Sequence, residues 1–204
     1  MADDVQKLPV TPEDPVSLEK IPQLIWSLLG EAVTDKGHPF RTPVIATSNK
    51  HGPEARIVVL RRIDAERRHL ECHTDVRSGK ISQLTGDDAI AWVFYDAAQK
   101  IQVRARGVAR IYNQDEYSHT RWTAISEHQK REYAQALPPG KKIGQEAAHY
   151  RRQSDADPES GRGNFAVISS CIHELEWLQL AREGHRRALM VFADQRWSAQ
   201  WLMP

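Results

Sequence analysis

The segment KIQVRARGVARIY, residues 100–112, has the most regular alternation of side chains in the chain. Apolar or small residues occupy every second position from Ile101 to Ile111, and four of the five positions between them are polar or charged. Successive side chains of a strand point to opposite faces of a sheet. The segment therefore predicts one long strand with a buried face and a face that carries arginines.

Strand-like segments lie on both sides of this stretch and are joined by short connections. The other predicted strands are residues 42–48, 55–63, 68–74, 89–95, 165–170, 172–181, 187–192 and 197–202. Consecutive strands with short connections favour an antiparallel meander, which removes its exposed edges by closing into a barrel. We therefore predict a mainly β, antiparallel barrel with flanking helices.

Helical patterns interrupt the strands. Apolar residues recur at three- and four-residue spacing over residues 17–34, with Ser17 as the N-cap, which predicts an amphipathic helix. A short helix is expected over residues 78–84. Asn113 with Glu116 resembles a capping box and predicts another helix directly after the long strand.

The organisation of the chain follows from these elements. We expect a polar N-terminal tail at residues 1–14 and a single domain over residues 15–204. Residues 113–164 are expected to form a helical or mobile insertion. Within it, the polar, glycine-containing stretch 153–164 predicts a loop.

Composition excludes several classes of protein. The 204 residues carry 28 Lys and Arg against 27 Asp and Glu, so a net charge of +1 argues against nucleic-acid binding through a global positive field. No apolar run approaches the ~18 residues of a membrane span, and the polar N-terminus does not resemble a secretory signal. Cys72 and Cys171 have no metal-site spacing, and the histidines form no metal-binding motif. We therefore expect a cytoplasmic protein with no metal site.

Against this neutral background, arginines recur inside strand-like segments. They are Arg56, Arg61, Arg62, Arg104 and Arg106. One interpretation is that they pair with Asp and Glu on an exposed face. The other is that they bind phosphate, which suits the planar guanidinium. In a continuous strand Arg56 and Arg61 would point to opposite faces, so both would reach one ligand only at a bulge or at the strand end.

The turn HTDVRSGK, residues 73–80, supports the phosphate interpretation. It leaves a strand and enters a short helix, so Ser78, Lys80 and backbone N–H groups could converge on an anion. The alternative is that Ser78 only caps the helix.

Taken together, three segments resemble the flavin-binding motifs of the pyridoxamine 5′-phosphate oxidase family. They are RIVVLR at 56–61, HTDVRSGK at 73–80 and QVRARG at 102–107. The family has an R-x-V-x-L-K strand, a Y-T-N-x-x-S-R-K turn and an R-Q-V-R-x-x-G strand in the same order. A weaker similarity follows in LEWLQ at 175–179 and HRR at 185–187. The resemblance implies an FMN-binding split β-barrel.

The resemblance also implies roles for individual residues toward FMN. Arg56, Lys80, and Arg77 or Ser78 would hold the FMN phosphate, while Val58, Val59, His73 and Thr74 would line the flavin and its ribityl chain. Gln102 would bind the flavin ring from the neighbouring subunit, and Arg187 and Trp177 match the family's C-terminal arginine and tryptophan. Arg61 replaces a family lysine and is expected to contact both cofactor and substrate. Such sites lie between two chains, so a homodimer is implied.

The substrate-binding positions depart further from the family. Tyr117 and Arg121 keep the Y-x-x-x-R spacing of the helix that binds the substrate phosphate, and His185 and Arg186 are expected to meet the substrate as well. However, Glu183 stands where an arginine is expected and would repel a phosphorylated vitamin. We therefore expect an FMN-dependent oxidoreductase that transfers hydride from a small molecule to flavin. The alternatives are a flavin- or haem-binding carrier or sensor, and a dimeric scaffold without a cofactor.

Overall fold

One antiparallel sheet organises the computed structural model, which describes residues 17–145 and 156–204. Its nine strands are β1 (Val44–Asn49), β2 (Gly52–Ile57), β3 (Arg62–Asp64), β4 (His69–Asp75), β5 (Ala89–Asp96), β6 (Ile101–Asn113), β7 (Phe165–Gln179), β8 (Arg186–Ala193) and β9 (Arg196–Leu202). The predicted mainly β, antiparallel fold is confirmed. The predicted tail, residues 1–14, lies outside the described residues, as do residues 146–155 of the predicted insertion.

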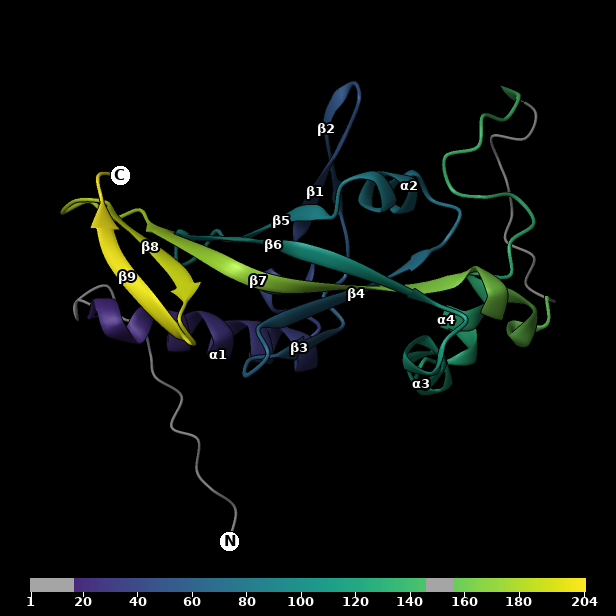
Figure 1. Ribbon diagram of the computed structural model, residues 1–204, viewed down its shortest axis with the longest axis horizontal. Coiled ribbons are helices and arrows are strands. Elements are labelled where there is room, and N and C mark those ends of the chain that lie inside the picture. Colours follow the sequence, from purple (N-terminus) through teal and green to yellow (C-terminus); the bar gives the residue numbers. More distant parts are fainter. Residues whose placement is uncertain (1–16, 146–155) are drawn as a thin grey trace, which may run out of the picture.

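The flanking helices are short apart from the first. They are α1 (Ile21–Thr34), α2 (Gly79–Gly86), α3 (Glu116–Ala124) and α4 (Glu127–Arg131), with 3-10 turns η1 (Leu18–Lys20), η2 (Pro39–Arg41) and η4 (Pro158–Asn164). In Figure 1, α1 runs below the sheet, and α3 and α4 lie at the end opposite β8 and β9. None of the helices in the described part of the chain is long and apolar enough to cross a membrane.

Strand β7 connects the two ends of the sheet. The strand order is β2-β1-β5-β6-β7-β4-β3, and β8 joins β7 to β9 (Figure 1). The first half of β7 pairs with β4, from Phe165 opposite Asp75 to Cys171 opposite His69. The second half pairs with β8, and β6 pairs along nearly its whole length. A single strand therefore belongs to both ends of the molecule.

The apolar residues form two cores. The main core contains α1, Trp92 and Phe94 of β5, and the alternate residues Ile101, Val103 and Ala105 of β6, all with 0–1% exposure for these named side chains. A smaller core, centred on Trp122, Phe165 and Val167, lies under α3 and α4. The predicted inward face of residues 101–107 is thus confirmed, because each alternate residue there is buried.

Two strand predictions were wrong in detail. Residues 55–63 do not form one strand, because the chain turns a corner between β2 and β3: Val58 donates its N–H to Pro43 on one side, and Arg61 donates to Glu71 on the other. The corner buries Leu60 completely. Conversely, the segments 165–170 and 172–181 form one strand, β7, whose pairing with β6 shifts register at Arg106 and Gly107.

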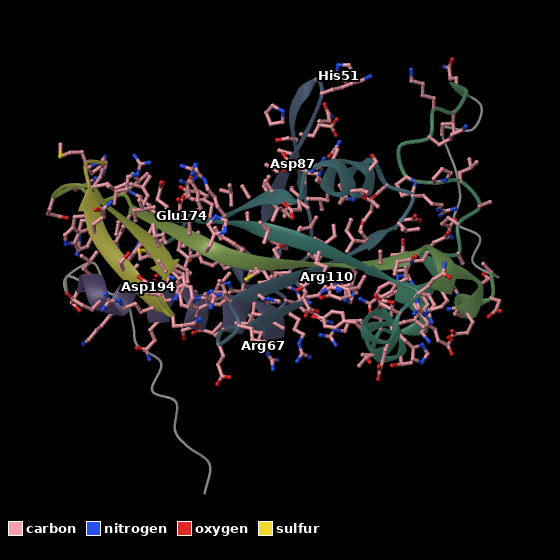
Figure 2. All side chains as sticks on the ribbon, in the orientation of Figure 1. His51, Arg67, Asp87, Arg110, Glu174 and Asp194 are labelled. Carbon is pink, nitrogen blue, oxygen red and sulfur yellow. The ribbon has the colours of Figure 1, made fainter. Side chains whose placement is uncertain are left out.

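The predicted helix starts also differ. Asp115, rather than Asn113, caps α3 and forms a capping box with Ser118. Ser17 precedes η1 without a side-chain capping bond, and α1 begins only at Ile21. Away from these helices, the hairpin of β1 and β2 extends from the sheet with His51 at its tip (Figure 2).

Candidate functional site

The end of β4 and the start of α2 bring together two hydroxyl side chains and one cation. Lys80 donates from Nζ to Thr74 Oγ1 at 3.0 Å and to Ser78 Oγ at 3.2 Å, and the two hydroxyl oxygens are 3.2 Å apart. Among the described residues, Lys80 forms no salt bridge. We call Thr74, Ser78, Lys80 and the nearby Arg56 the open cluster.

Burial makes this lysine an unusual cation. Burial lowers the pKa of Lys80, and the positive charge of Arg56 lowers it further. The first effect is the loss of water around the ammonium and the second is like-charge repulsion; Asp75 offsets them only in part, because it forms no salt bridge with Lys80. An incoming anion would relieve both costs.

Ser78 is oriented toward this cluster and does not cap its helix. It is the N-cap residue of α2, and its backbone is extended as usual there, but its side chain makes no capping hydrogen bond. Its oxygen instead contacts Thr74 and Lys80. The interpretation of Ser78 as only a helix cap is therefore wrong, and the helix N-terminus adds its own attraction for an anion.

Arg56 reaches the cluster from β2. Its guanidinium donates to Thr47 of β1, to Gln83 of α2 at 3.0 Å and to Glu54 at 3.2 Å. Gln83 is buried, so Arg56 is anchored on one side, while 22% of its side chain stays exposed. A phosphate could be contacted by this remaining exposed part.

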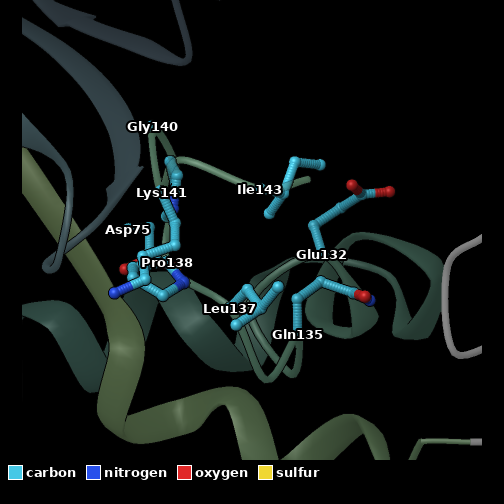
Figure 3. Close-up of a pocket in the computed structure, with 9 residues that line it drawn as sticks. Asp75, Glu132, Gln135, Leu137, Pro138, Gly140, Lys141 and Ile143 are labelled. Atoms are coloured by element: carbon cyan, nitrogen blue, oxygen red, sulfur yellow. The ribbon is translucent and has the colours of Figure 1, made fainter. Parts of the chain in front are cut away.

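Arg77 has a different role from its neighbours. Its guanidinium binds Asp75 through two hydrogen bonds of 2.9 and 2.6 Å, and it donates to the backbone oxygens of Gln135 and Ala136. This segment lines a cavity of about 280 Å³ together with Asp75 and the turn around Pro138. Figure 3 draws the residues that line it. Arg77 therefore connects the backbone at residues 135–136 to the end of β4.

On the opposite face of β4, the buried carboxylate of Glu71 is hydrogen-bonded by side chains of α3. Glu71 accepts from Arg121 Nε and Nη2, both at 3.1 Å, and from the Tyr117 hydroxyl. Only 3% of the Glu71 side chain and 17% of the Arg121 side chain are exposed. The guanidinium also lies 4.0 Å from the Tyr117 ring centroid. We call Glu71, Tyr117 and Arg121 the closed cluster.

Arg61 and His73 lie beside the closed cluster: Arg61 donates its backbone N–H to Glu71, and Glu71 and Arg121 both act on the His73 pKa. Burial lowers the pKa of Arg61, and no ion-pair partner for it is present among the described residues. Burial lowers the pKa of His73 to about 4, with Arg61 contributing to the shift, so its ring is neutral at pH 7. The ring packs edge-on against Phe165 of the small core. Val58 and Val59 belong to the adjoining corner between β2 and β3.

The C-terminal candidates lie at the other end of the sheet. Gln102 is opposite Leu178, and Leu178 is opposite Arg187. His73 is opposite Val167. The eleven residue steps from Val167 to Leu178 along β7 correspond to about 35 Å. One chain therefore holds the two groups of predicted flavin contacts far apart.

Within this distant group, the side chains do not all share a face. Trp177 pairs with Val103 and is buried in the main core, with its indole nitrogen lacking a hydrogen-bond partner. Arg187 bonds Glu176 at 3.0 Å, and its Nε has no partner. His185 accepts a hydrogen bond from the backbone N–H of Ala181, and Arg186 is half-buried opposite Gln179.

Two other strand arginines form ion pairs with carboxylates of the neighbouring strand. Arg104 pairs with Glu176 and Arg106 with Glu174, across from β6 to β7. For these two residues the interpretation as ion pairs between strands is confirmed. Among the described residues, no group of three or more His, Cys, Asp and Glu could hold a metal ion.

Two residues of this region were absent from the sequence-based candidates. Glu71 could have been found, because an acidic residue inside the otherwise apolar strand segment HLECHT needs a buried partner. Tyr133 could not, because it reaches Arg61 from a segment with no clear periodicity.

Comparison with known proteins agrees with this architecture. Residues 23–113 match the family described as "Pyridoxamine 5'-phosphate oxidase, FMN-binding domain". The chain is also similar to a solved pyridoxamine 5′-phosphate oxidase-related, FMN binding protein from Nostoc punctiforme PCC 73102, with TM-score 0.73 and 22% identity over 89% of this chain and 96% of that one. None of the curated proteins matches the chain.

A second solved structure extends the likeness over more of the chain. PhzG from Burkholderia lata 383, in complex with tetrahydrophenazine-1-carboxylic acid, has TM-score 0.70 and 19% identity and covers 96% of this chain and 98% of its own. At such identities the likeness concerns the fold, and the class of protein is the split β-barrel. The match to the FMN-binding domain of pyridoxamine 5′-phosphate oxidases covers residues 23–113, and the two solved structures extend the similarity in fold over most of the chain.

Proposed function

We propose that this chain is an FMN-dependent oxidoreductase that binds the FMN phosphate at the open cluster. The observation that carries the proposal is Lys80, a partly buried ammonium bound to two hydroxyl groups and to no carboxylate among the described residues. A buried cation without a counter-ion is costly, so its retention favours an anionic ligand.

The donors of the open cluster fit a phosphate. Lys80 and Arg56 supply positive charge from two directions, Thr74 and Ser78 supply hydroxyl groups, and α2 points its N-terminus at the same place. Charge-assisted contacts of this kind are the strong ones for phosphate. Arg77 is not part of this donor set, because Asp75 holds its guanidinium.

A second copy of the chain would complete the site. Gln102 and Arg187 lie about 35 Å along β7 from the level of His73, too far to contact the same flavin within one chain. The unpartnered Nε of Arg187 supports a ligand-facing role for that end. Exposed apolar side chains such as Ile57, with 71% exposure, give a partner surface to cover. We therefore propose a homodimer with FMN between the subunits.

When bound, FMN supplies hydride acceptance, and the protein supplies binding and orientation. The corner at Val58 and Val59 would line the flavin, and the neutral His73 would offer an uncharged edge beside it. Arg61 would receive an anionic group of the substrate. The described residues include no group that we assign as an acid or base.

FMN titration tests the phosphate site. The double variant Arg56→Ala/Lys80→Ala should raise the Kd for FMN about a hundredfold or more, since each lost charge-assisted hydrogen bond is worth about 1.5–3 kcal/mol. Flavin fluorescence measures the Kd. The matched control is Arg106→Ala, which removes an arginine paired with Glu174 on β7 and should leave the Kd unchanged.

Three outcomes separate the hypotheses. Wild-type protein that does not bind FMN overturns the proposal, and an unchanged Kd in the double variant moves the phosphate elsewhere. FMN that binds but is not reduced anaerobically by a panel of small-molecule reductants favours the carrier or sensor. Mixing the double variant with Arg187→Ala chains should restore one intact site per heterodimer if the two subunits share it.

A further inference from the structure

In the closed cluster, the anion that Arg121 and Tyr117 bind is the carboxylate of Glu71, a residue of the same chain. The fork of Arg121 binds both oxygens of Glu71, and the Tyr117 hydroxyl adds a third contact. A guanidinium fork with a phenolic hydroxyl is also a donor set that suits an external phosphate. Here the carboxylate already uses those donors.

An external phosphate could not simply join this arrangement. Glu71 is 3% exposed in its side chain, so it cannot turn to water while another anion takes its place. A dianion beside the retained carboxylate would face like-charge repulsion in a region of low dielectric. The position is therefore closed to phosphate as long as Glu71 is ionised.

Arg61, by contrast, has no anion of its own. Among the described residues it forms no ion pair, and burial disfavours its charge. His73 lies near Arg61 and also near the Glu71–Arg121 pair, because all three residues act on its pKa. His73 thus lies near one neutralised arginine, Arg121, and one arginine without a counter-ion, Arg61.

We propose that Glu71 determines the substrate class of this site: it closes the Arg121–Tyr117 position to phosphate monoesters, and a substrate brings a single carboxylate-type charge to Arg61. The inference rests on the proposed function for the identity of the pocket, but its geometric basis is independent of FMN. It predicts that unphosphorylated carboxylates are preferred to phosphorylated compounds of the same size.

The test compares two probes of similar shape, benzoate and phenyl phosphate, by calorimetric titration of FMN-saturated protein. Wild type should bind phenyl phosphate no more tightly than benzoate. Glu71→Gln keeps the size of the side chain and removes its charge, so it should bind phenyl phosphate at least about tenfold more tightly than wild type. Benzoate brings only a single charge to the freed donors, so its affinity should rise by less than that of phenyl phosphate.

Controls identify the origin of any gain. Glu174→Gln removes a carboxylate that pairs with Arg106, outside the closed cluster, and should give no gain. Glu71→Gln/Arg121→Gln removes the donor fork and should also give none. If Glu71→Gln does not fold, as judged by thermal melting, Glu71→Ser makes room beside Arg121 and replaces it.

No gain in the Glu71 variant, or a wild type that prefers phenyl phosphate, overturns the inference. A parallel titration in FMN-free protein carrying Lys80→Ala disables the open cluster and reads the closed cluster alone. Failure to bind FMN would therefore reject the proposed function without deciding this question, while the probe titrations would still decide it.

Discussion

The two faces of β4 carry polar clusters that differ in whether a carboxylate of the chain binds the cation. On one face Glu71 supplies the closed cluster with its own anion, and on the other face Lys80 meets only hydroxyl groups. Glu71 and Thr74 are three positions apart along the strand, so they point to opposite faces. Both clusters are partly buried, so burial alone does not distinguish them.

The difference teaches how to separate structural from ligand-binding arginines and lysines in one fold. A cation with a buried carboxylate contributes to stability, and its removal should damage the fold. A cation held by hydroxyl groups lacks a counter-ion, so its removal should damage ligand binding and leave the fold largely intact. Each prediction below can break or sharpen that distinction.

The largest effect is expected from Glu71→Ala. This variant leaves the Arg121 guanidinium, whose side chain is 17% exposed, without its anion. We expect the free energy of unfolding to fall by about 3–4 kcal/mol, measured by urea denaturation. The matched Glu174→Ala variant removes a carboxylate from a more exposed pair and should cost less than about 1 kcal/mol. Equal losses in the two variants would erase the distinction between buried and exposed pairs.

The next effect is a pH dependence through His73, which lies beside the closed cluster. Burial lowers its pKa from 6.5 to about 4, so the unfolded chain binds a proton there between these values while the folded chain does not. Stability should therefore be complete above pH 6.5 and fall by about 3 kcal/mol as the pH drops to about 4, with no further loss through this group below that.

His73→Phe keeps a ring against Phe165 and should flatten this slope, as measured by urea denaturation at several pH values. His51→Gln, at the exposed tip of the β1–β2 hairpin, is the control and should retain the slope (Figure 2). A slope that survives His73→Phe would assign the pH dependence to other groups.

The smallest effect compares Lys80 with Arg77. Lys80→Ala should raise the Kd for FMN about tenfold to a hundredfold, while Arg77→Ala should change it by less than about threefold, because Asp75 and the 135–136 backbone hold Arg77. Fluorescence titration measures both. The reverse order would place the phosphate at Arg77 and leave the open cluster without a ligand.

Much of the fold could be predicted because side-chain alternation is a local signal. The long strand over residues 100–112 was recognised from its alternation and is β6, at 101–113. The run 55–63 was predicted as one strand because its residue types favour strand throughout. Its corner depends on hydrogen bonds to Pro43 and Glu71 and on the burial of Leu60, which are tertiary effects.

The site was less accessible to sequence reasoning for a related reason. The turn motif at residues 73–80 predicted that Lys80, Ser78 and Thr74 act as one group, because they are close in sequence. They are in contact in the structure. The pairing of Glu71 with Arg121 spans 50 residues and depends on how α3 packs on β6 and on β7, which is next to β4 in the sheet. No local pattern encodes such a pair, although a lone acid in an apolar strand indicates that a partner must exist.

The position of β7 has a consequence for the order in which the chain can fold. Strands β4 and β6 each need β7 as a neighbour, but β7 follows β4 by roughly a hundred residues, as in the Ser169–His69 hydrogen bond, which spans 100. Contacts of such long range slow folding. During synthesis the chain must therefore carry unpaired edges on β4 and β6 until residues 165–179 leave the ribosome, and both cores close only then.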